Sequence, residues 1–249
     1  MIFGGGIMEN AIVIKSLRKE FGAKTAVRDI SLSFKEGMVF SLLGVNGAGK
    51  TTTIRMLSGL SKPTSGDAFI YGKSILKDMN EIKKFSNLSP QETSIAPNLT
   101  VEENLEFVAS IYGIPKAERL GRIAQLARQF DLDEVLHQKA KTLSGGWQRK
   151  VSIAMALITK PKVLYLDEPT LGLDVLARRE LWDVIEKLKG NITIILTTHY
   201  MEEAEQLSDY VAVMVKGDVK ACGTVEELKK QTNTVSLEEA FITIAREGK

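Results

Sequence analysis

The chain has 249 residues, of which 44% are hydrophobic and 26% are charged, and its formal net charge is +2 at pH 7. This length allows one large domain or two small ones, and the near-neutral charge provides no basic field for nucleic acid and no acidic tail. The single cysteine, Cys222, excludes an intrachain disulfide and a cysteine-based zinc cluster, and it favours a reducing cytoplasmic setting.

The sequence contains no signal for membrane insertion. No uninterrupted apolar run approaches the roughly 18 residues needed to span a bilayer. The opening segment 1–10 lacks a basic region, and its apolar stretch is short for a secretory signal. We interpret residues 1–7 as a flexible leader, with Met8 as an alternative start.

Two short β-prone runs, 11–14 and 30–34, predict an antiparallel pair of strands near the start of the chain. Phe21 lies at the turn of the segment between them. It would serve either as a platform on which a nucleotide base stacks or as an ordinary core aromatic, and both interpretations stay open at this point.

A phosphate-binding motif follows. An apolar run at 38–43 leads into Gly44–Thr52 (GVNGAGKTT) and then into a helix-compatible run at 50–60, which is the strand–turn–helix setting that G-x-x-x-x-G-K-[ST] requires. Glycines let the backbone turn tightly and direct N–H groups at phosphate oxygens beside a helix N-terminus. Lys50 would reach the β- and γ-phosphates, and the Thr51 hydroxyl would bind Mg²⁺. The alternative is a glycine-rich turn that binds nothing. The predicted nucleotide-binding residues of this stretch are Gly44, Asn46, Gly47, Ala48, Gly49, Lys50, Thr51 and Thr52.

The next segments predict a loop, a strand and a tight turn over 61–75, and a second strand over 84–89. Gln91 comes just after this second strand. A polar amide at the carboxyl end of a strand in an α/β sheet points toward the ligand crevice, although a glutamine alone is more often a surface residue.

The middle of the chain reads as a helical insertion. A capping box at 100–103 opens a helix that stops at 113–115, and charged, periodic segments follow at 116–130 and 132–137. Ser144 is a good N-cap ahead of a predicted helix at 151–158, and Gly145 and Gly146 leave N–H groups open to an anion. A capped helix start without any ligand is the alternative.

Two further strands end in functional side chains. The apolar strand 162–168 ends in Asp167 and Glu168, which places both carboxylates beside the phosphate loop in a parallel sheet. Asp167 would hold the Mg²⁺ shell and Glu168 would orient and deprotonate a water, unless the two acids merely form a surface turn. The buried strand 192–198 ends at His199, which would donate to a γ-phosphate oxygen or hold the water, or be incidental.

The remaining elements are helices at 174–188 and 201–207, a β-hairpin over 211–223 that turns at 216–218, and C-terminal helices opened by capping boxes at 224–227 and 236–239.

Taken in order, these motifs resemble the nucleotide-binding subunit of ATP-binding-cassette (ABC) transporters over nearly the whole chain. The resemblance is carried by a Walker A at Gly44–Thr51, a Q-loop Gln91, the LSGG signature at Leu143–Gly146, a Walker B pair at Asp167–Glu168, a D-loop at Leu171–Asp174 and a switch histidine at His199. Many phosphate-loop proteins contain Walker motifs, whereas LSGG upstream of Walker B is nearly diagnostic of this family.

The resemblance implies an α/β phosphate-loop NTPase core with a mainly parallel sheet, an N-terminal antiparallel β subdomain and an inserted α-helical subdomain. The chain would form a single ATP-binding domain: 8–89 and 160–223 as the core, 90–159 as the helical insertion with the signature, and 224–249 as C-terminal helices.

The resemblance also implies an ATPase that uses ATP and Mg²⁺ and works as a head-to-tail homodimer. Ser144, Gly145 and Gly146 of one copy would grip the γ-phosphate held by Lys50 of the other. In addition, Asp174 and Phe21 would bind the nucleotide, Glu168, His199 and Gln91 would act in catalysis, and Thr51, Gln91 and Asp167 would hold the metal.

The implied partners are a second ATP-binding subunit and an integral membrane permease, without nucleic acid. The permease would dock in a groove running from Gln91 to Tyr112 and hold the chain at the cytoplasmic face of the membrane. The segments around His199 and at 236–247 look like the exporter-type subfamily that handles drugs, sodium ions or polysaccharide and lipid precursors.

Two positions depart from the family pattern. Trp147 stands where a glutamine or another polar residue is usual, which bears on ATP affinity more than on mechanism, and Phe21 replaces the commoner tyrosine.

Two other functions compete with transport: a soluble ABC-type ATPase acting on nucleic acid or cluster assembly, and a nucleotide-binding regulator without turnover. The regulator is disfavoured because Lys50 and Glu168 are both present.

Overall fold

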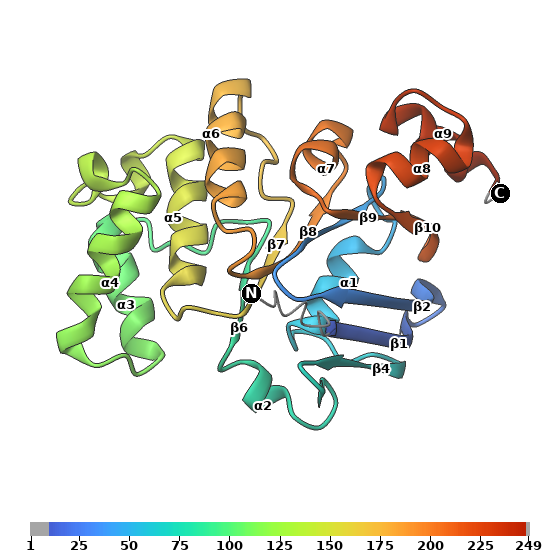
Figure 1. Ribbon diagram of the computed structural model, residues 1–249. Coiled ribbons are helices and arrows are strands. Elements are labelled where there is room, and N and C mark those ends of the chain that lie inside the picture. Colours follow the sequence, from blue (N-terminus) through green and yellow to red (C-terminus); the bar gives the residue numbers. More distant parts are fainter. Residues whose placement is uncertain (1–9, 248–249) are drawn as a thin grey trace, which may run out of the picture.

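The computed structural model describes residues 10–247 (Figure 1), so the predicted leader lies outside the described residues. Two sheets organise this part of the chain. A six-stranded sheet has the order β10-β9-β3-β8-β7-β6, and a four-stranded antiparallel sheet has the order β2-β1-β4-β5. Together with the helices they confirm the predicted α/β fold, while the subdomain boundaries given above stay a prediction.

The six-stranded sheet is parallel except for its last hairpin. Neighbours from β6 to β9 all pair in parallel, and β10 runs antiparallel to β9, which confirms the predicted C-terminal hairpin. Strands β3, β7 and β8 are buried along their whole length, as continuous apolar strands covered on both faces should be. The strands are β3 (Val39–Leu43), β6 (Ser86–Ser89), β7 (Val163–Asp167), β8 (Thr193–Thr198), β9 (Tyr210–Val215) and β10 (Asp218–Gly223).

The four-stranded sheet contains longer strands than the sequence predicts. Pairing of β1 with β2 continues to Phe21 opposite Lys24, because Leu17 and Val27 are buried in the segment that we expected to be a connection. A register shift between Ile14 and Leu17 interrupts the alternation that sequence reading depends on. The strands are β1 (Asn10–Phe21), β2 (Lys24–Lys35), β4 (Ser65–Ile70) and β5 (Lys73–Ser74).

The helices follow the predicted order. Three details differ: α2 was not predicted, the segment 132–137 forms only a 3₁₀ turn, and the helix expected at 151–158 begins six residues earlier, at Gly145, because Ser144 caps it there. The helices are α1 (Lys50–Leu57), α2 (Met79–Ile82), α3 (Val101–Ile111), α4 (Lys116–Gln129), α5 (Gly145–Leu157), α6 (Val175–Glu186), α7 (Met201–Leu207), α8 (Val225–Thr232) and α9 (Leu237–Glu247), with 3₁₀ turns at Asp133–Val135 and Ala140–Thr142.

Three apolar clusters hold these elements together. The largest joins α3, α4, α5 and α6 to β7 and β8, and the second joins the four-stranded sheet to α1 and the other face of the central sheet. The third packs α8 and α9 on the β9–β10 hairpin. Figure 1 shows α3, α4 and α5 grouped on one side of the central strands, and α8 and α9 at the far end. Within residues 10–247, no helix is long and apolar enough to cross a membrane.

Candidate active site

The phosphate loop connects β3, at the middle of the central sheet, to α1, and its glycines are needed for space as well as for conformation. A Cβ added to Gly44 would lie 2.4 Å from the Met214 carbonyl oxygen, and one added to Gly49 would lie 2.6 Å from that of Ala26. Gly49 also has a φ of +106°, which side chains rarely adopt. The fold of this loop therefore depends on β9 and β2 as well as on its own sequence.

Lys50 is buried inside this loop. Its Nζ donates to the Gly44 carbonyl at 2.7 Å and lies 3.1 Å from Oε1 of Glu168. The side chains of this ion pair are both buried, at 5% exposed for Lys50 and 6% for Glu168. The ammonium is thus held at the centre of the loop, where its charge is compensated by an acid and by carbonyl oxygens.

Glu168 directly follows β7 and has a left-handed backbone, with φ of +49°. Its N–H donates to Oγ1 and to the carbonyl oxygen of Thr197 on the neighbouring strand, at 3.0 and 3.1 Å. These bonds hold a conformation that a non-glycine residue seldom adopts. The turn directs the carboxylate back over the sheet edge, where Lys50 and His199 contact it from two sides.

His199 follows the adjacent strand β8, as predicted. Its Nδ1 lies 2.5 Å from Oε2 of Glu168, and its ring packs against Tyr200. The predicted role of His199 was contact with a phosphate or a water, and the contact observed in the chain alone is with the carboxylate. The strand pairing explains why the two residues share one edge.

Asp167 joins the phosphate loop to the end of β7. Its Oδ1 accepts from the hydroxyl of Thr51 at 2.9 Å and from that of Thr197 at 2.6 Å. Hydroxyl and carboxylate oxygens are donors that Mg²⁺ accepts, and this ion keeps several ligands for water and phosphate. Within residues 10–247 no cluster of three or more histidine, cysteine, aspartate or glutamate side chains could hold a metal by itself. The donors present therefore fit an ion shared with a phosphate ligand.

Gln91 lies in the exposed loop after β6, and a buried arginine fixes its backbone. Arg149 of α5 donates from Nη1 to the Pro90 carbonyl at 2.7 Å and from Nη2 to that of Gln91 at 2.5 Å. Burial lowers the pKa of Arg149 below its ordinary value, while nearby Asp167 and Glu203 oppose that shift. The sequence motif contained Arg149, but nothing in its spacing indicated this contact.

A cavity of about 320 Å³ lies beside the phosphate loop, and of the predicted residues described above Gly44 and Asp167 do not line it. Most of the predicted nucleotide-binding and catalytic residues line it, together with Leu171 of the predicted D-loop and two residues of β2 that were not predicted, Lys24 and Ala26. The predicted residues that line it are Asn46, Gly47, Ala48, Gly49, Lys50, Thr51, Thr52, Gln91, Glu168 and His199. Lys24 and Ala26 belong to a strand whose approach to the phosphate loop depends on the tertiary fold, so no local motif marks them.

Phe21 lies outside this cavity, at the end of β1 and 54% exposed. Its partner across the hairpin, Lys24, is a lining residue, so the ring is close to the mouth. The ammonium of Lys19 lies 4.8 Å from the ring centroid. The exposure shows that Phe21 is not a core aromatic, and stacking on a base stays a prediction.

The signature residues also lie outside the cavity. Ser144 caps α5, with its hydroxyl oxygen accepting from the Trp147 N–H at 3.5 Å, and Ser144 and Gly145 are exposed. A Cβ on Gly146 would come within 3.0 Å of Ala177 on α6, so the helix start packs closely on α6. Asp174 caps α6 through bonds from the N–H groups of Leu176 and Ala177. Within one chain, neither group reaches the phosphate loop cavity.

Comparison with known proteins decides the family. The model of the family described as ABC transporter matches residues 27–171, more than half of the chain. The chain belongs to the ABC transporter family. It is 44% identical to human phospholipid-transporting ATPase ABCA3 over 224 residues, which are 88% of this chain and 13% of that protein. It is 41% identical to the glucosylceramide transporter ABCA12 of Mus musculus over 226 residues, 90% of this chain and 9% of that protein.

Solved structures agree with the family assignment. The structure of the ATP-binding subunit of an ABC transporter superposes with a TM-score of 0.84 at 31% identity, covering 94% of this chain and 99% of the other. A dimeric structure of the ATP-binding cassette MJ0796 bound to ADP and Pi superposes with a TM-score of 0.77 at 25% identity, covering 86% and 98%. The chain is an ABC-type ATPase domain, and it spans about an eighth of the length of human ABCA3.

Proposed function

We propose that this ABC ATPase domain binds ATP with Mg²⁺, hydrolyses it in a head-to-tail dimer, and powers transport through a membrane permease. One observation carries the proposal: Lys50, Thr51, Glu168 and His199 line one cavity at the carboxyl edge of the sheet, and Asp167 accepts a hydrogen bond from Thr51 there. Phosphate cradle, metal donors and a carboxylate base are the parts that phosphoryl transfer to water requires.

The ion pair of Lys50 with Glu168 suggests how binding prepares the chemistry. A phosphate entering the loop would compete with Glu168 for the ammonium, because it brings more negative charge to the same place. Glu168 would then be free to accept a proton from water, with His199 Nδ1 holding its other oxygen. Thr51, Asp167 and Gln91 would hold Mg²⁺, which neutralises charge that develops on the phosphate oxygens.

We further propose that a second copy completes the site. Ser144, Gly145 and Gly146 present a capped helix start at the surface, and such a start favours anions. The neighbouring start of α6, with Asp174, exposes Val175 and Leu176, which are 69% and 75% accessible. Large exposed apolar side chains beside an anion-binding helix start support contact with another chain. The similarity to a cassette that is dimeric with ADP and Pi is consistent with this arrangement.

The permease would dock beside Gln91, in the groove toward Tyr112. A cavity of about 460 Å³ there is lined by Leu60, Leu88 and Tyr112, among others, and Phe107 and Ile111 on α3 are more than half exposed. Exposed apolar side chains on a helix together with a cavity of this size support a protein partner. Docking would hold the domain at the cytoplasmic face of the membrane.

We infer that the cargo is a lipid or another amphipathic molecule moved by export, because the similar ABCA3 and ABCA12 proteins are named for phospholipid and glucosylceramide transport. The permease, and no residue described here, would select the cargo. The alternative is an ABC-type ATPase without a permease. Purification from native membranes separates the two, since only the first would bring a multi-span membrane protein with it.

Substitution Glu168→Gln tests the catalytic proposal. The amide keeps the shape but cannot take a proton, so turnover should fall by about 10²–10⁴-fold. ATP binding should persist, and the chain should form an ATP-dependent dimer visible by analytical ultracentrifugation. Wild-type turnover in this variant would show that Glu168 is not the base.

A further inference from the structure

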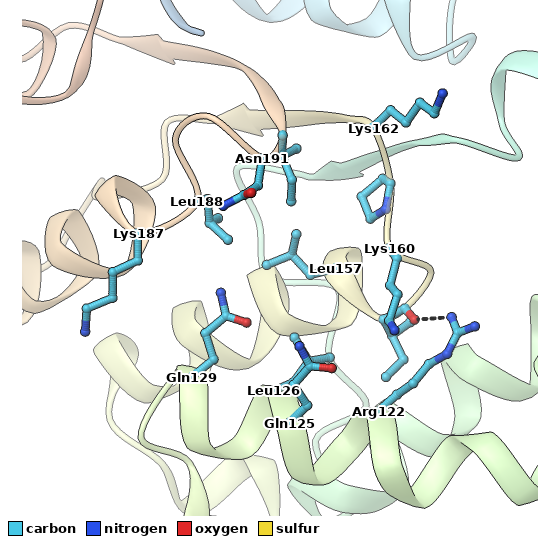
Figure 2. Close-up of a pocket in the computed structure, with 13 residues that line it drawn as sticks. Arg122, Gln125, Leu126, Gln129, Leu157, Lys160, Lys162, Lys187, Leu188 and Asn191 are labelled. Carbon is cyan, nitrogen blue, oxygen red and sulfur yellow. Dashed lines mark hydrogen bonds between the residues drawn. The ribbon is translucent and has the colours of Figure 1, made fainter. Parts of the chain in front are cut away.

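A second cavity lies on the opposite edge of the central sheet from the nucleotide site. Its volume is about 440 Å³, and it is formed by α4, the end of α5 with the loop to β7, and the loop from α6 to β8 (Figure 2). Strands β7 and β8 begin here, whereas Glu168 and His199 follow their other ends. The two cavities share no lining residue, so a ligand in one leaves the other free.

The floor of this cavity is apolar. Leu126 on α4, Leu157 at the end of α5 and Leu188 after α6 line it, and each is less than 9% exposed. Leu126 belongs to the same face of α4 as the polar residues that rise into the cavity, since positions 122, 125, 126 and 129 share one helix face. An apolar floor of this size suits the hydrocarbon or ring portion of a small molecule.

The rim is polar and carries only positive charge. Figure 2 shows the amide groups of Gln125, Gln129 and Asn191 between α4 and the loop after α6. The only side-chain hydrogen bond among the residues drawn runs from Arg122 Nη1 to the Ile158 carbonyl, at 3.0 Å. Within the described chain the lining contains no carboxylate. The basic residues of the lining are Arg122, Lys160, Lys162 and Lys187.

Two of these cations are engaged elsewhere. Arg122 pairs with Glu118 at 3.0 Å, and Lys162 lies over the Tyr71 ring. Lys160 is exposed and its side chain lies beside Arg122 in Figure 2. Carbonyl groups at the ends of helices would repel an anion, but those at this cavity already accept hydrogen bonds. The Leu157 carbonyl accepts from the Lys160 N–H at 2.9 Å, and the Leu188 carbonyl accepts from two N–H groups that follow it. The Lys187 side chain points away from the amide groups in Figure 2, so Lys160 is the cation best placed to bind a ligand.

We propose that this cavity binds a small amphipathic anion, with a carboxylate or phosphate head held by Lys160 and the amides, and an apolar body on the leucine floor. Charge-assisted hydrogen bonds to the head and burial of the body would each contribute to affinity. The site joins α4 to the loops that feed β7 and β8. Occupation would therefore stabilise the packing of the helical region on the sheet.

Calorimetric titration with octyl phosphate tests the proposal, with ADP saturating so that the phosphate loop is occupied. Saturable binding is expected, with octanol and inorganic phosphate each at least about tenfold weaker, since each lacks one of the two parts. Octanoate serves as a second probe: the tighter of the two head groups identifies carboxylate or phosphate as the preferred ligand, and either result supports the site.

Substitutions in the lining test whether octyl phosphate binds in this cavity. Lys160 has a φ of +53°, a conformation that asparagine tolerates, so Lys160→Asn removes the charge without new backbone strain. This substitution should lower the affinity for octyl phosphate at least about tenfold. Lys77→Asn, which makes the same charge change at an exposed position elsewhere, should leave that affinity unchanged. Gln125→Trp should fill the cavity and block both probes. The proposal would be overturned if octyl phosphate bound Lys160→Asn as tightly as the wild type, or if octanol bound as tightly as octyl phosphate. Displacement of octyl phosphate by ADP, or the absence of saturable octyl phosphate binding, would also overturn it.

Discussion

At the scale of single residues, the site is organised around one carboxylate held between an ammonium group and an imidazole nitrogen. Glu168 contacts the Lys50 ammonium with one oxygen and Nδ1 of His199 with the other. Its left-handed backbone sets this geometry, and the bonds from its N–H to Thr197 maintain it. A phosphate that draws Lys50 away would leave Glu168 with His199 alone, which links nucleotide binding to activation of the base.

The Thr51 hydroxyl gives the metal proposal a direct test. Because it bonds to Asp167 and would share the ion with it, Thr51→Val should raise the Mg²⁺ concentration for half-maximal turnover by roughly tenfold or more. Thr51→Ser keeps the hydroxyl and should behave nearly as wild type. Steady-state hydrolysis measured across a Mg²⁺ series checks both, and an unchanged Mg²⁺ dependence in the valine variant would exclude Thr51 as a ligand.

A buried acid outside the cavity predicts how stability depends on pH. Glu203 of α7 is fully buried and accepts from Nε1 of Trp182 on α6 at 3.2 Å. Burial raises its pKa above the usual 4.5, against the opposing hydroxyls of Thr198 and Thr170 and the Trp182 indole. A raised pKa means that the folded state holds the proton longer, so this stabilising contribution is present at low pH and lost as pH rises through the folded pKa.

Glu203→Gln removes that titration and keeps an acceptor for Trp182. The free energy of unfolding of the wild type, taken relative to this variant, should therefore fall as the pH rises above the usual glutamate pKa of 4.5. Urea unfolding at a series of pH values measures the difference. A difference that stays constant with pH would show that Glu203 does not titrate in this range.

Motif residues could be predicted individually because phosphate binding dictates residue types at fixed local spacing, as at Gly44, Gly49 and Lys50. Lys24 and Arg149 could not, because each reaches the site through the tertiary fold: Lys24 from the four-stranded sheet, and Arg149 across 58 positions to Gln91. The direct contact of His199 with Glu168 depends on side-chain conformations, although their common sheet edge was predictable from the two strands.

At the scale of elements, α5 connects the two halves of the proposed mechanism. Its first residues belong to the signature. One turn later, Arg149 donates hydrogen bonds from two guanidinium nitrogens to the carbonyls of Pro90 and Gln91. A displacement of the signature would therefore be passed to the Gln91 loop through a buried, bidentate contact. This loop also borders the groove in which we place the permease.

Arg149→Lys tests this connection, since lysine keeps the charge but cannot make both bonds. We expect a loss of about 1 to 3 kcal/mol in the free energy of unfolding. Faster hydrogen exchange should be confined to residues 90–95, with little change in affinity for ATP. Lys187→Arg, an exposed change between the same residue types, is the matched control. Unchanged exchange in the Gln91 loop would contradict the connection.

Element boundaries show where sequence reasoning fails. The apolar parallel strands were predicted closely because burial on both faces gives a continuous apolar run, as in β7 and β8. The β1–β2 hairpin was predicted too short, because a register shift breaks the alternation near Ser16. The start of α5 was missed because glycines at 145 and 146 read as loop residues, whereas the Ser144 cap makes them the first turn.

At the scale of the whole molecule, one chain keeps the two proposed parts of the active site apart. The phosphate loop cavity is lined by Lys50, Thr51, Gln91 and the proposed base Glu168, while the exposed signature lies outside it. The family resemblance, carried by the LSGG motif, predicted this division from the sequence. The structure of a single chain adds that Ser144 and Asp174 are N-caps of α5 and α6.

The central claim is that each active site combines Lys50 of one chain with Ser144 of another, and mixing two inactive variants tests it most directly. Lys50→Ala and Ser144→Arg should each lack ATPase activity alone. Mixed in equal amounts they should recover about a quarter of wild-type turnover, because half of the dimers would be mixed and each would contain one complete site. Recovery on mixing is the predicted result, and a mixture as inactive as its two components would contradict the account.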